Sequence, residues 1–242
     1  MRIAISGCQN TGKTTLITNI LQVWPQYVTP EKTYRDLIKD KQLPHSSLAS
    51  KDTQLDILGF MIEQMGDYKK GSKVVYDRCP IDNLVYTLWC HDKGIDGFDK
   101  TFVDQTISLV KESMRSLDII YLLRYDGSIK IVDDGLRDTN LDYIKEIDNI
   151  FDVLYQQYYH NLESDIFFPK DDSPCIIPLP ASGQQRIDII SEYLTPSGEL
   201  YGDEESIFNP SKLTELEALV QQQKHALEME QRERAMYEKF KI

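Results

Sequence analysis

The sequence predicts an α/β domain, a three-layer sandwich in which a five-stranded parallel sheet carries helices on both faces. Short apolar runs that suit buried strands alternate with longer stretches whose apolar residues recur at helical spacing. A segment rich in Pro, Gly and acidic residues then precedes a final stretch of strong helix formers. We therefore expect a domain over residues 1–195, a linker over 196–210 and a C-terminal helical extension over 211–242.

The apolar runs and the turn residues between them give the individual elements. Strands are expected at "RIAIS", "QYVT", "KVVY", "LDIIYLL" and "PCIIPLP", which are residues 2–6, 26–29, 73–76, 117–123 and 174–180. Helices are expected over residues 13–24, 31–40, 52–70, 80–94, 99–116, 140–162 and 183–194. Asp52 is expected to cap the third helix, and Gly71 to close it. The polar stretch 124–140, with two Asp-Gly pairs, predicts a loop.

Composition limits the kinds of partner that suit the chain. Its 27 basic and 39 acidic residues give a net charge of −12, which argues against broad binding to nucleic acid without excluding a local basic groove. No apolar run is long enough to predict a membrane span, and "MRIAIS" does not resemble a signal peptide. The four cysteines lack C-x-x-C spacing, so we expect reduced thiols and a cytoplasmic location.

The stretch "GCQNTGKT" matches the pattern G-x-x-x-x-G-K-[ST], directly between the first expected strand and the first expected helix. Gly7 and Gly12 allow main-chain N–H groups to surround phosphate oxygens, and the start of the helix adds positive potential. Lys13 is expected to reach the outer phosphates, and the Thr14 hydroxyl is expected to bind Mg²⁺. Asn10, Thr11 and Thr15 complete the expected contacts to the nucleotide. The motif thus predicts a site for Mg²⁺ and ATP in the phosphate-loop (P-loop) NTPase fold, and it leaves open which group receives the phosphate.

The segment "VVYDRCPIDNLVY" resembles the strand-plus-"DR" segment of thymidylate kinases and deoxynucleoside kinases. Its D-R-x-x-x-D-x-x-x-Y spacing is most similar to the phage and bacterial P-loop kinases grouped with the nicotinamide riboside kinases. The matching residues are Asp77, Arg78, Asp82 and Tyr86. The resemblance implies that Asp77 holds the metal or acts on the acceptor, that Arg78 binds phosphate or acceptor, and that Asp82 helps to bind the acceptor. An ion pair for Asp77 and Arg78, and a helix-start role for Asp82, remain alternatives. Cys79 departs from the family pattern, which leaves the acceptor open.

"YVTPEKTYRDLI" carries a second resemblance to these kinases, in which a Glu near the second strand is followed four residues later by an Arg. Glu31 and Arg35 match this spacing. The resemblance implies that Glu31 accepts a proton or hydrogen-bonds a sugar, and that Arg35 binds the acceptor; a surface pair on a helix is the alternative. Gln54 and Gln64 lie on the next expected helix, where relatives read a base through an amide.

Two further segments are similar to the same group. "VDDGLRD" resembles a lid loop, which implies a lid over about 124–139 hinged at Gly127 and Gly135. Arg137 is then the first candidate to neutralise charge on the moving phosphate, and Arg124 the second. "IIPLPASGQQR" resembles the segment that lies against adenine, with Arg186 as a nucleotide contact.

Together these features predict an ATP-dependent kinase whose acceptor is a nucleoside or a nucleoside monophosphate. Glu31 or Asp77 would act as base for a hydroxyl acceptor, whereas Arg35 and Arg78 would clamp a phosphate acceptor. The two arginines favour the monophosphate. Nicotinamide riboside or a hydroxymethylated base in DNA remain alternatives. So does a nucleotide-dependent switch that signals through the C-terminal helix, a segment that could also form a homo-oligomer.

Overall fold

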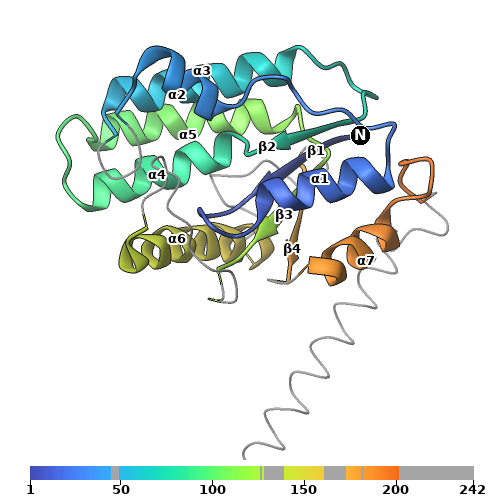
Figure 1. Cartoon of the computed structure of the whole chain (residues 1–242). Helices are drawn as coiled ribbons and strands as arrows, with labels where there is room; N and C mark the ends of the chain where they lie inside the picture. The colour runs from blue at the N-terminus through green and yellow to red at the C-terminus, as the bar shows by residue number, and fades with distance from the viewer. Residues whose placement is uncertain (45–48, 126, 128–138, 161–172, 181–182, 202–242) are drawn as a thin grey trace, which may run out of the picture.

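The computed structural model describes residues 1–44, 49–125, 127, 139–160, 173–180 and 183–201. Its centre is a parallel sheet with the strand order β2-β1-β3-β4 (Figure 1). The strands are β1 (Arg2–Ser6), β2 (Val74–Asp77), β3 (Ile119–Leu123) and β4 (Cys175–Leu179). Because β1 is flanked on both sides, the loop that follows it leaves the middle of the carboxyl edge of the sheet, where ligands of open α/β sheets bind.

The expected strand at 26–29 is wrong in extent, so the described residues form four strands rather than five. Val28 makes a single parallel bridge to Val74 beyond the edge of β2. Its N–H donates to the carbonyl of Lys73, and its own carbonyl accepts from the N–H of Val75. Pro25 and Pro30 flank this segment and have no N–H to donate, which prevents the pairing from extending.

Seven helices accompany the strands in the described part of the chain. They are α1 (Lys13–Val23), α2 (Tyr34–Lys41), α3 (Lys51–Gly66), α4 (Pro80–Asp92), α5 (Lys100–Met114), α6 (Leu141–His160) and α7 (Gly183–Tyr193). The helices α2 and α3 begin at other residues than the sequence predicts, because other residues provide their N-terminal caps. Thr33 and Asp36 form a capping box that begins α2 three residues after Glu31. Ser50, rather than Asp52, caps α3 by accepting from the N–H of Thr53, and α3 ends before Gly71.

Two hydrophobic cores lie on opposite faces of the sheet. Alternate residues of each strand point to opposite faces, so Ile3 and Ile5 of β1 face one core while Ala4 faces the other. The first core is closed by α1 and α7, and the second by α3, α4, α5 and α6 (Figure 1). This confirms the three-layer arrangement and fixes the loops at the carboxyl ends of the strands on a rigid support.

Several expected features lie outside the described residues. These include the C-terminal helix at 211–242, the linker beyond residue 201, and most of the expected lid, with Gly135 and Arg137. Residues 196–201, the described part of the expected linker, pack against the end of α1. There, the Trp24 indole N–H donates to the carbonyl of Thr195, and the Tyr27 hydroxyl donates to that of Gly198.

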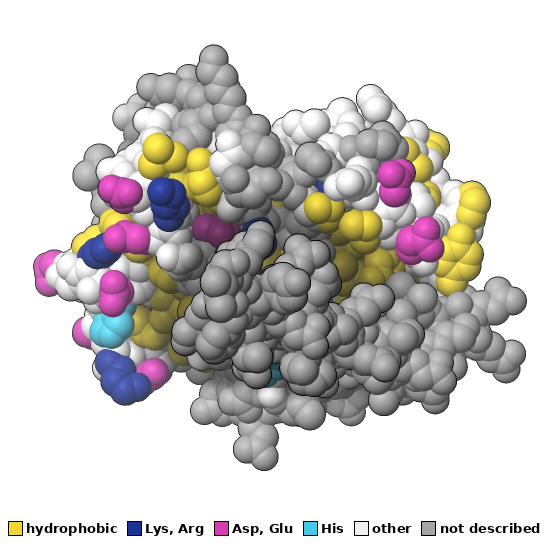
Figure 2. Space-filling view, turned by 90° about the horizontal axis from the view of Figure 1, so that it is seen from below, with side chains coloured by type: hydrophobic (Ala, Val, Ile, Leu, Met, Phe, Trp, Pro, Cys, Tyr) yellow, Lys and Arg dark blue, Asp and Glu magenta, His cyan; other side chains and the backbone are white. Residues whose placement is uncertain are grey.

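The described surface carries charges of both signs. On the face shown in Figure 2, Lys and Arg side chains stand among Asp and Glu side chains rather than gathering in a strip. None of the helices in the described ranges is long and apolar enough to cross a membrane. The four cysteines are free thiols, of which Cys8, Cys79 and Cys90 are buried.

Candidate active site

The loop between β1 and α1 adopts a conformation that depends on its glycines. Gly7 has φ +132°, and a Cβ added there would lie 2.2 Å from the carbonyl oxygen of Leu123 at the end of β3. Gly12 has φ +81° and precedes the first turn of α1. Asn10 also has a positive φ, of 61°. The main chain of residues 7–12 therefore curls tightly against the carboxyl edge of the sheet, with the N-terminus of α1 beside it.

Lys13 lies inside this loop. Its ammonium group donates to the carbonyl of Gly7 at 2.8 Å, to the carbonyl of Cys8 and to the Thr11 hydroxyl at 3.3 Å. Burial, helped by the positive charge of Arg78, lowers the pKa of Lys13 to about 7. The ammonium group is thus enclosed by the loop that the motif assigns to phosphate.

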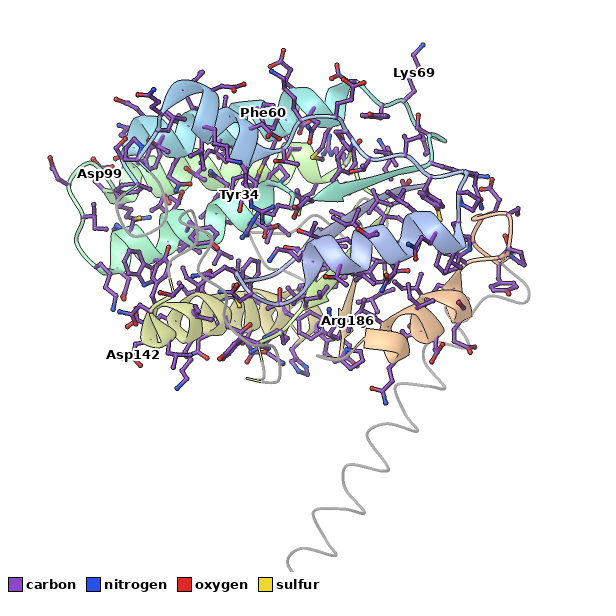
Figure 3. All side chains as sticks on the ribbon, in the orientation of Figure 1. Tyr34, Phe60, Lys69, Asp99, Asp142 and Arg186 are labelled. Atoms are coloured by element: carbon purple, nitrogen blue, oxygen red, sulfur yellow. The ribbon has the colours of Figure 1, made fainter. Side chains whose placement is uncertain are left out.

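A pocket of about 70 Å³ opens at the loop. Its wall consists of residues 9–15 together with Arg35 from α2. Thr14 and Thr15 are exposed on this wall, as contacts to phosphate or metal require. Arg186 lies behind the loop rather than in the pocket (Figure 3): its guanidinium donates to the carbonyl of Thr11 at 2.9 Å and to that of Pro180 at 2.7 Å.

Asp77 ends β2 beside the pocket. Its Oδ2 accepts from Nη1 of Arg35 at 3.1 Å, whereas its Oδ1 is buried and has no partner among the described residues. A carboxylate with an unsatisfied oxygen and an exposed Thr14 hydroxyl both suit Mg²⁺. The described residues contain no group of three His, Cys, Asp or Glu side chains able to hold a metal alone. These donors therefore fit an ion that is held mainly by nucleotide phosphates and water.

Arg78 is buried, and both of its terminal nitrogens are bonded to protein groups, whereas its Nε has no partner among the described residues. It has φ +81°, and its guanidinium donates to the carbonyl of Gly7, to Asp82 and to the Tyr86 hydroxyl at 3.2, 2.8 and 3.3 Å. Tyr34 lies between two arginines, with its ring centroid 5.0 Å from the guanidinium of Arg78 and 5.2 Å from that of Arg35. Tyr34 thus lies close to both positive groups, and its own position is labelled in Figure 3.

Asp82 is a hub of hydrogen bonds inside the protein. Its carboxylate accepts from the Ser6 hydroxyl at 2.7 Å, the N–H of Gly7 at 3.3 Å, Arg78 at 2.8 Å and the N–H of Cys79 at 3.1 Å. The bond from Cys79 also forms the capping box of α4. With 1% of its surface exposed, Asp82 binds β1, the loop and α4 together, which favours a positioning role over contact with the acceptor.

The structure does not bring the expected Glu31 and Gln64 into this cluster. Glu31 is exposed and precedes α2. Gln64 is half-buried, and its amide donates to the carbonyl of Lys32 at 2.6 Å, which ties α3 to the segment before α2. Gln54 is instead buried near the start of α3, where Nδ2 of Asn83 donates to its side-chain oxygen at 2.6 Å and its carbonyl at 2.9 Å.

Arg124 follows β3 and is held by acidic side chains of α6. It donates to Asp148 at 3.1 and 2.9 Å and also contacts Asp152. Asp148 accepts in addition from the N–H of Tyr125 at 2.9 Å and from the thiol of Cys8 at 3.7 Å. Asp148 therefore connects the end of β3 to the phosphate loop.

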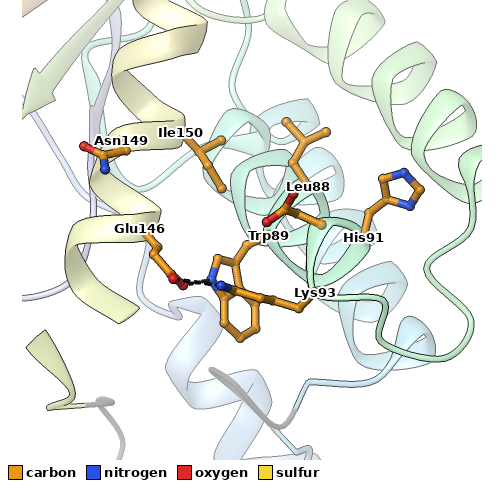
Figure 4. Close-up of a pocket in the computed structure, with 8 residues that line it drawn as sticks. Leu88, Trp89, His91, Lys93, Glu146, Asn149 and Ile150 are labelled. Atoms are coloured by element: carbon orange, nitrogen blue, oxygen red, sulfur yellow. Dashed lines mark hydrogen bonds and ion pairs between the residues drawn. The ribbon is translucent and has the colours of Figure 1, made fainter. Parts of the chain in front are cut away.

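A second, wider groove of about 710 Å³ lies between α4 and α6 (Figure 4). Here the indole N–H of Trp89 and the ammonium of Lys93 both donate to Glu146, each at 2.7 Å. Trp89 and Lys93 thus satisfy Glu146, and the carboxyl edge of the sheet, where the phosphate-loop motif lies, remains the better candidate.

Sequence reasoning did not find Gln9, Tyr34, Asn83 or Asp148 as parts of this region. Tyr34 and Asn83 are next in sequence to the predicted residues Arg35 and Asp82, and this adjacency is the signal that could have identified them. Gln9 occupies a variable position of the loop motif, and Asp148 lies on a helix with no motif at all.

The fold and the loop define a P-loop nucleotide-binding domain. A family model described as "AAA domain" matches residues 2–165, which is more than half of the chain, and the protein belongs to this family. No curated protein sequence matches the chain.

Solved structures show the same fold at low sequence identity. Deoxyadenosine kinase from M. mycoides, with products dCMP and a flexible dCDP bound, superposes with a TM-score of 0.54 and 17% identity over 78% of this chain and 96% of that one. The same enzyme with bound dATP gives a TM-score of 0.53. NadR in complex with NR gives 0.56 at 15% identity, over 83% of this chain but only 53% of the NadR chain. These likenesses establish a nucleoside kinase-like fold.

Proposed function

We propose that the protein is an ATP-dependent kinase that transfers the terminal phosphoryl group of ATP to a small nucleoside-type acceptor. The proposal rests on a complete phosphate loop that lies beside the carboxylate of Asp77. One oxygen of this carboxylate has no partner among the described residues, and the other accepts from Arg35 of the pocket wall.

In this proposal the loop N–H groups and the N-terminus of α1 bind the triphosphate. The phosphates replace the carbonyl oxygens of Gly7 and Cys8 as partners of the Lys13 ammonium. Thr14 and Asp77 would hold Mg²⁺, which when bound supplies positive charge to the phosphate oxygens. Arg186 supports the loop from behind. Arg137 lies outside the described residues and stays the expected charge-neutralising group, with Arg124 as second candidate.

The acceptor is a nucleoside hydroxyl in preference to a nucleoside monophosphate. The sequence favours the monophosphate because it predicts two arginines, Arg35 and Arg78, that clamp a phosphate. Arg78 is buried and already bonded to three protein groups, so Arg35 alone is left on the pocket wall. Asp77, beside the pocket, is then the first candidate for the base, as the alternative to its role as a Mg²⁺ ligand, whereas Glu31 is exposed.

The kinase-like solved structures support the same acceptor class. One is a deoxyadenosine kinase, and another was solved with NR bound. A deoxynucleoside and nicotinamide riboside are therefore the first acceptors to test. Gln54 and Asn83 form a buried amide pair near the start of α3 and α4 and are candidates to contact the base.

The test is an acceptor screen with γ-labelled ATP and Mg²⁺. The panel contains deoxyadenosine, deoxycytidine, other nucleosides, nicotinamide riboside, the corresponding monophosphates and DNA with hydroxymethylated bases. We expect label to appear on one or more nucleosides, and to disappear with Lys13→Ala at unchanged circular dichroism. ATP hydrolysis with no labelled acceptor would contradict the proposal and favour a nucleotide-dependent switch.

A further inference from the structure

Gln9 occupies a variable position of the loop motif, yet its side chain is 6% exposed and lines the phosphate pocket. Its Oε1 accepts a hydrogen bond from the Tyr86 hydroxyl at 3.1 Å. Its Nε2 is buried and has no hydrogen-bond partner in the described part of the chain. A buried donor without a partner costs free energy in the unliganded protein, which calls for an explanation.

The direction of the Gln9 amide follows from the chemistry of its neighbours. A guanidinium can only donate, so the bond between Arg78 and the Tyr86 hydroxyl requires the hydroxyl oxygen to accept. The hydroxyl proton remains available for Gln9, and Oε1 of Gln9 accepts it. Burial raises the pKa of Tyr86, which keeps this proton in place. The remaining N–H₂ group of Gln9 is consequently turned away from Tyr86.

We propose that this N–H₂ group of Gln9 is a side-chain ligand of the terminal phosphate of ATP, and that Tyr86 is the positioning residue that fixes its direction. The inference rests on the proposed function and adds to it a phosphate ligand that the loop motif does not specify. The ammonium of Lys13 now occupies the inside of the loop. When phosphate draws that ammonium away, an anion comes within reach of the unpartnered donor.

The position of Gln9 indicates the terminal phosphate rather than an inner one. The inner phosphates belong to Gly12–Thr15, where the N–H groups of α1 begin. Gln9 stands in the first half of the loop, in contact with Tyr86 of α4 and next to the Arg78 cluster. That side of the loop is where Asp77 and the proposed acceptor lie.

The test compares the dissociation constants of Mg·ATP and Mg·ADP, measured by calorimetry, for wild type, Gln9→Ala, Gln9→Glu and Tyr86→Phe. We expect Gln9→Ala to weaken ATP binding about tenfold, the loss typical of a hydrogen bond to a charged group, while ADP binding changes little. Gln9→Glu should weaken ATP binding further, because a carboxylate repels the phosphate. Tyr86→Phe should give a smaller loss of ATP preference, because the amide is then free to turn.

Gln22→Ala, on the exposed surface of α1, is the matched control and should bind both nucleotides like wild type. Thermal unfolding without nucleotide verifies that each variant is folded. Equal weakening of ATP and ADP in the Gln9 variants, or no weakening, would overturn this inference even if the wild type phosphorylates an acceptor. A wild type that binds neither nucleotide would overturn the proposed function together with it.

Discussion

Arg35 and Asp77 form an ion pair across the mouth of the phosphate loop, with 3.1 Å between Nη1 and Oδ2. The two residues are 42 positions apart and come from α2 and the end of β2. Arg35 also lines the phosphate pocket. In the proposed kinase, a bound phosphate would therefore compete with Asp77 for the same guanidinium.

Asp77→Asn removes the proposed base and metal ligand with little change in shape. We expect the rate of phosphoryl transfer to fall about 100-fold or more, the usual range for a lost acid–base group, while the fold persists. Steady-state kinetics with the acceptor identified in the screen measures the effect. Asp56→Asn is the control, because Asp56 forms only an exposed pair with Lys41. Full activity in Asp77→Asn would refute the role assigned to this carboxylate.

ATP binding should take up a proton above neutral pH. Burial lowers the pKa of Lys13 to about 7, so the share of molecules that carry a neutral Lys13 before binding grows as the pH rises above neutrality. The phosphates favour the charged form and raise this pKa, so affinity should fall as pH rises above 7. Calorimetry in buffers of different ionisation enthalpy counts the protons. Lys13→Arg, which stays charged, should show no uptake through this group, and uptake equal to that of wild type would contradict the prediction.

Asp82→Asn should destabilise the protein by about 3–5 kcal/mol, because Arg78 would keep a buried charge without its counter-ion. The four donors that meet at Asp82 cannot all be satisfied by an amide oxygen. Equilibrium unfolding in urea gives the change. The matched control is Asp104→Asn, which breaks an exposed pair with Lys100 and should change the free energy of unfolding by less than about 0.5 kcal/mol. Equal effects of the two changes would show that Asp82 is not a structural hub.

Gly7→Ala places a Cβ within 2.2 Å of the Leu123 carbonyl oxygen, at a φ that side chains rarely adopt. We expect a loss of at least about 2 kcal/mol in the free energy of unfolding. Gly59→Ala, in the middle of α3 with no atom within 4 Å of the new Cβ, should instead stabilise the protein by about 0.5–1 kcal/mol. Thermal unfolding of both variants measures the change in stability. A Gly7→Ala protein as stable as wild type would contradict the prediction and show that the loop can relax.

The sequence alone predicted the layered α/β fold, the phosphate loop and the elements on either side of it. These features are local: apolar periodicity and glycine spacing report directly on strands, helices and one tight loop. The strand predicted at 26–29 was wrong in extent because two flanking prolines limit its pairing to Val28. Residue propensities do not show how far a segment pairs at the edge of a sheet.

The rest of the candidate site depends on contacts that no local pattern encodes. Asp82 matched a family spacing, but only the structure shows that its oxygens are taken by Ser6, Gly7 and Arg78. The pairing of Arg35 with Asp77 joins two segments that are distant in the chain. The helix expected from Glu31 begins instead at Tyr34, because the capping box of Thr33 and Asp36 provides a better start.

Trp24 and Tyr27 donate hydrogen bonds to the turn at Thr195–Gly198 and hold it against the end of α1. The position of this turn indicates where a label can be attached to the protein. This turn lies at the end of α1 that is opposite Lys13, about 16 Å along the helix axis from the phosphate loop. A fluorophore or surface linkage attached at Tyr201, which is exposed, would therefore report on or immobilise the molecule without obstructing the mouth of its pocket.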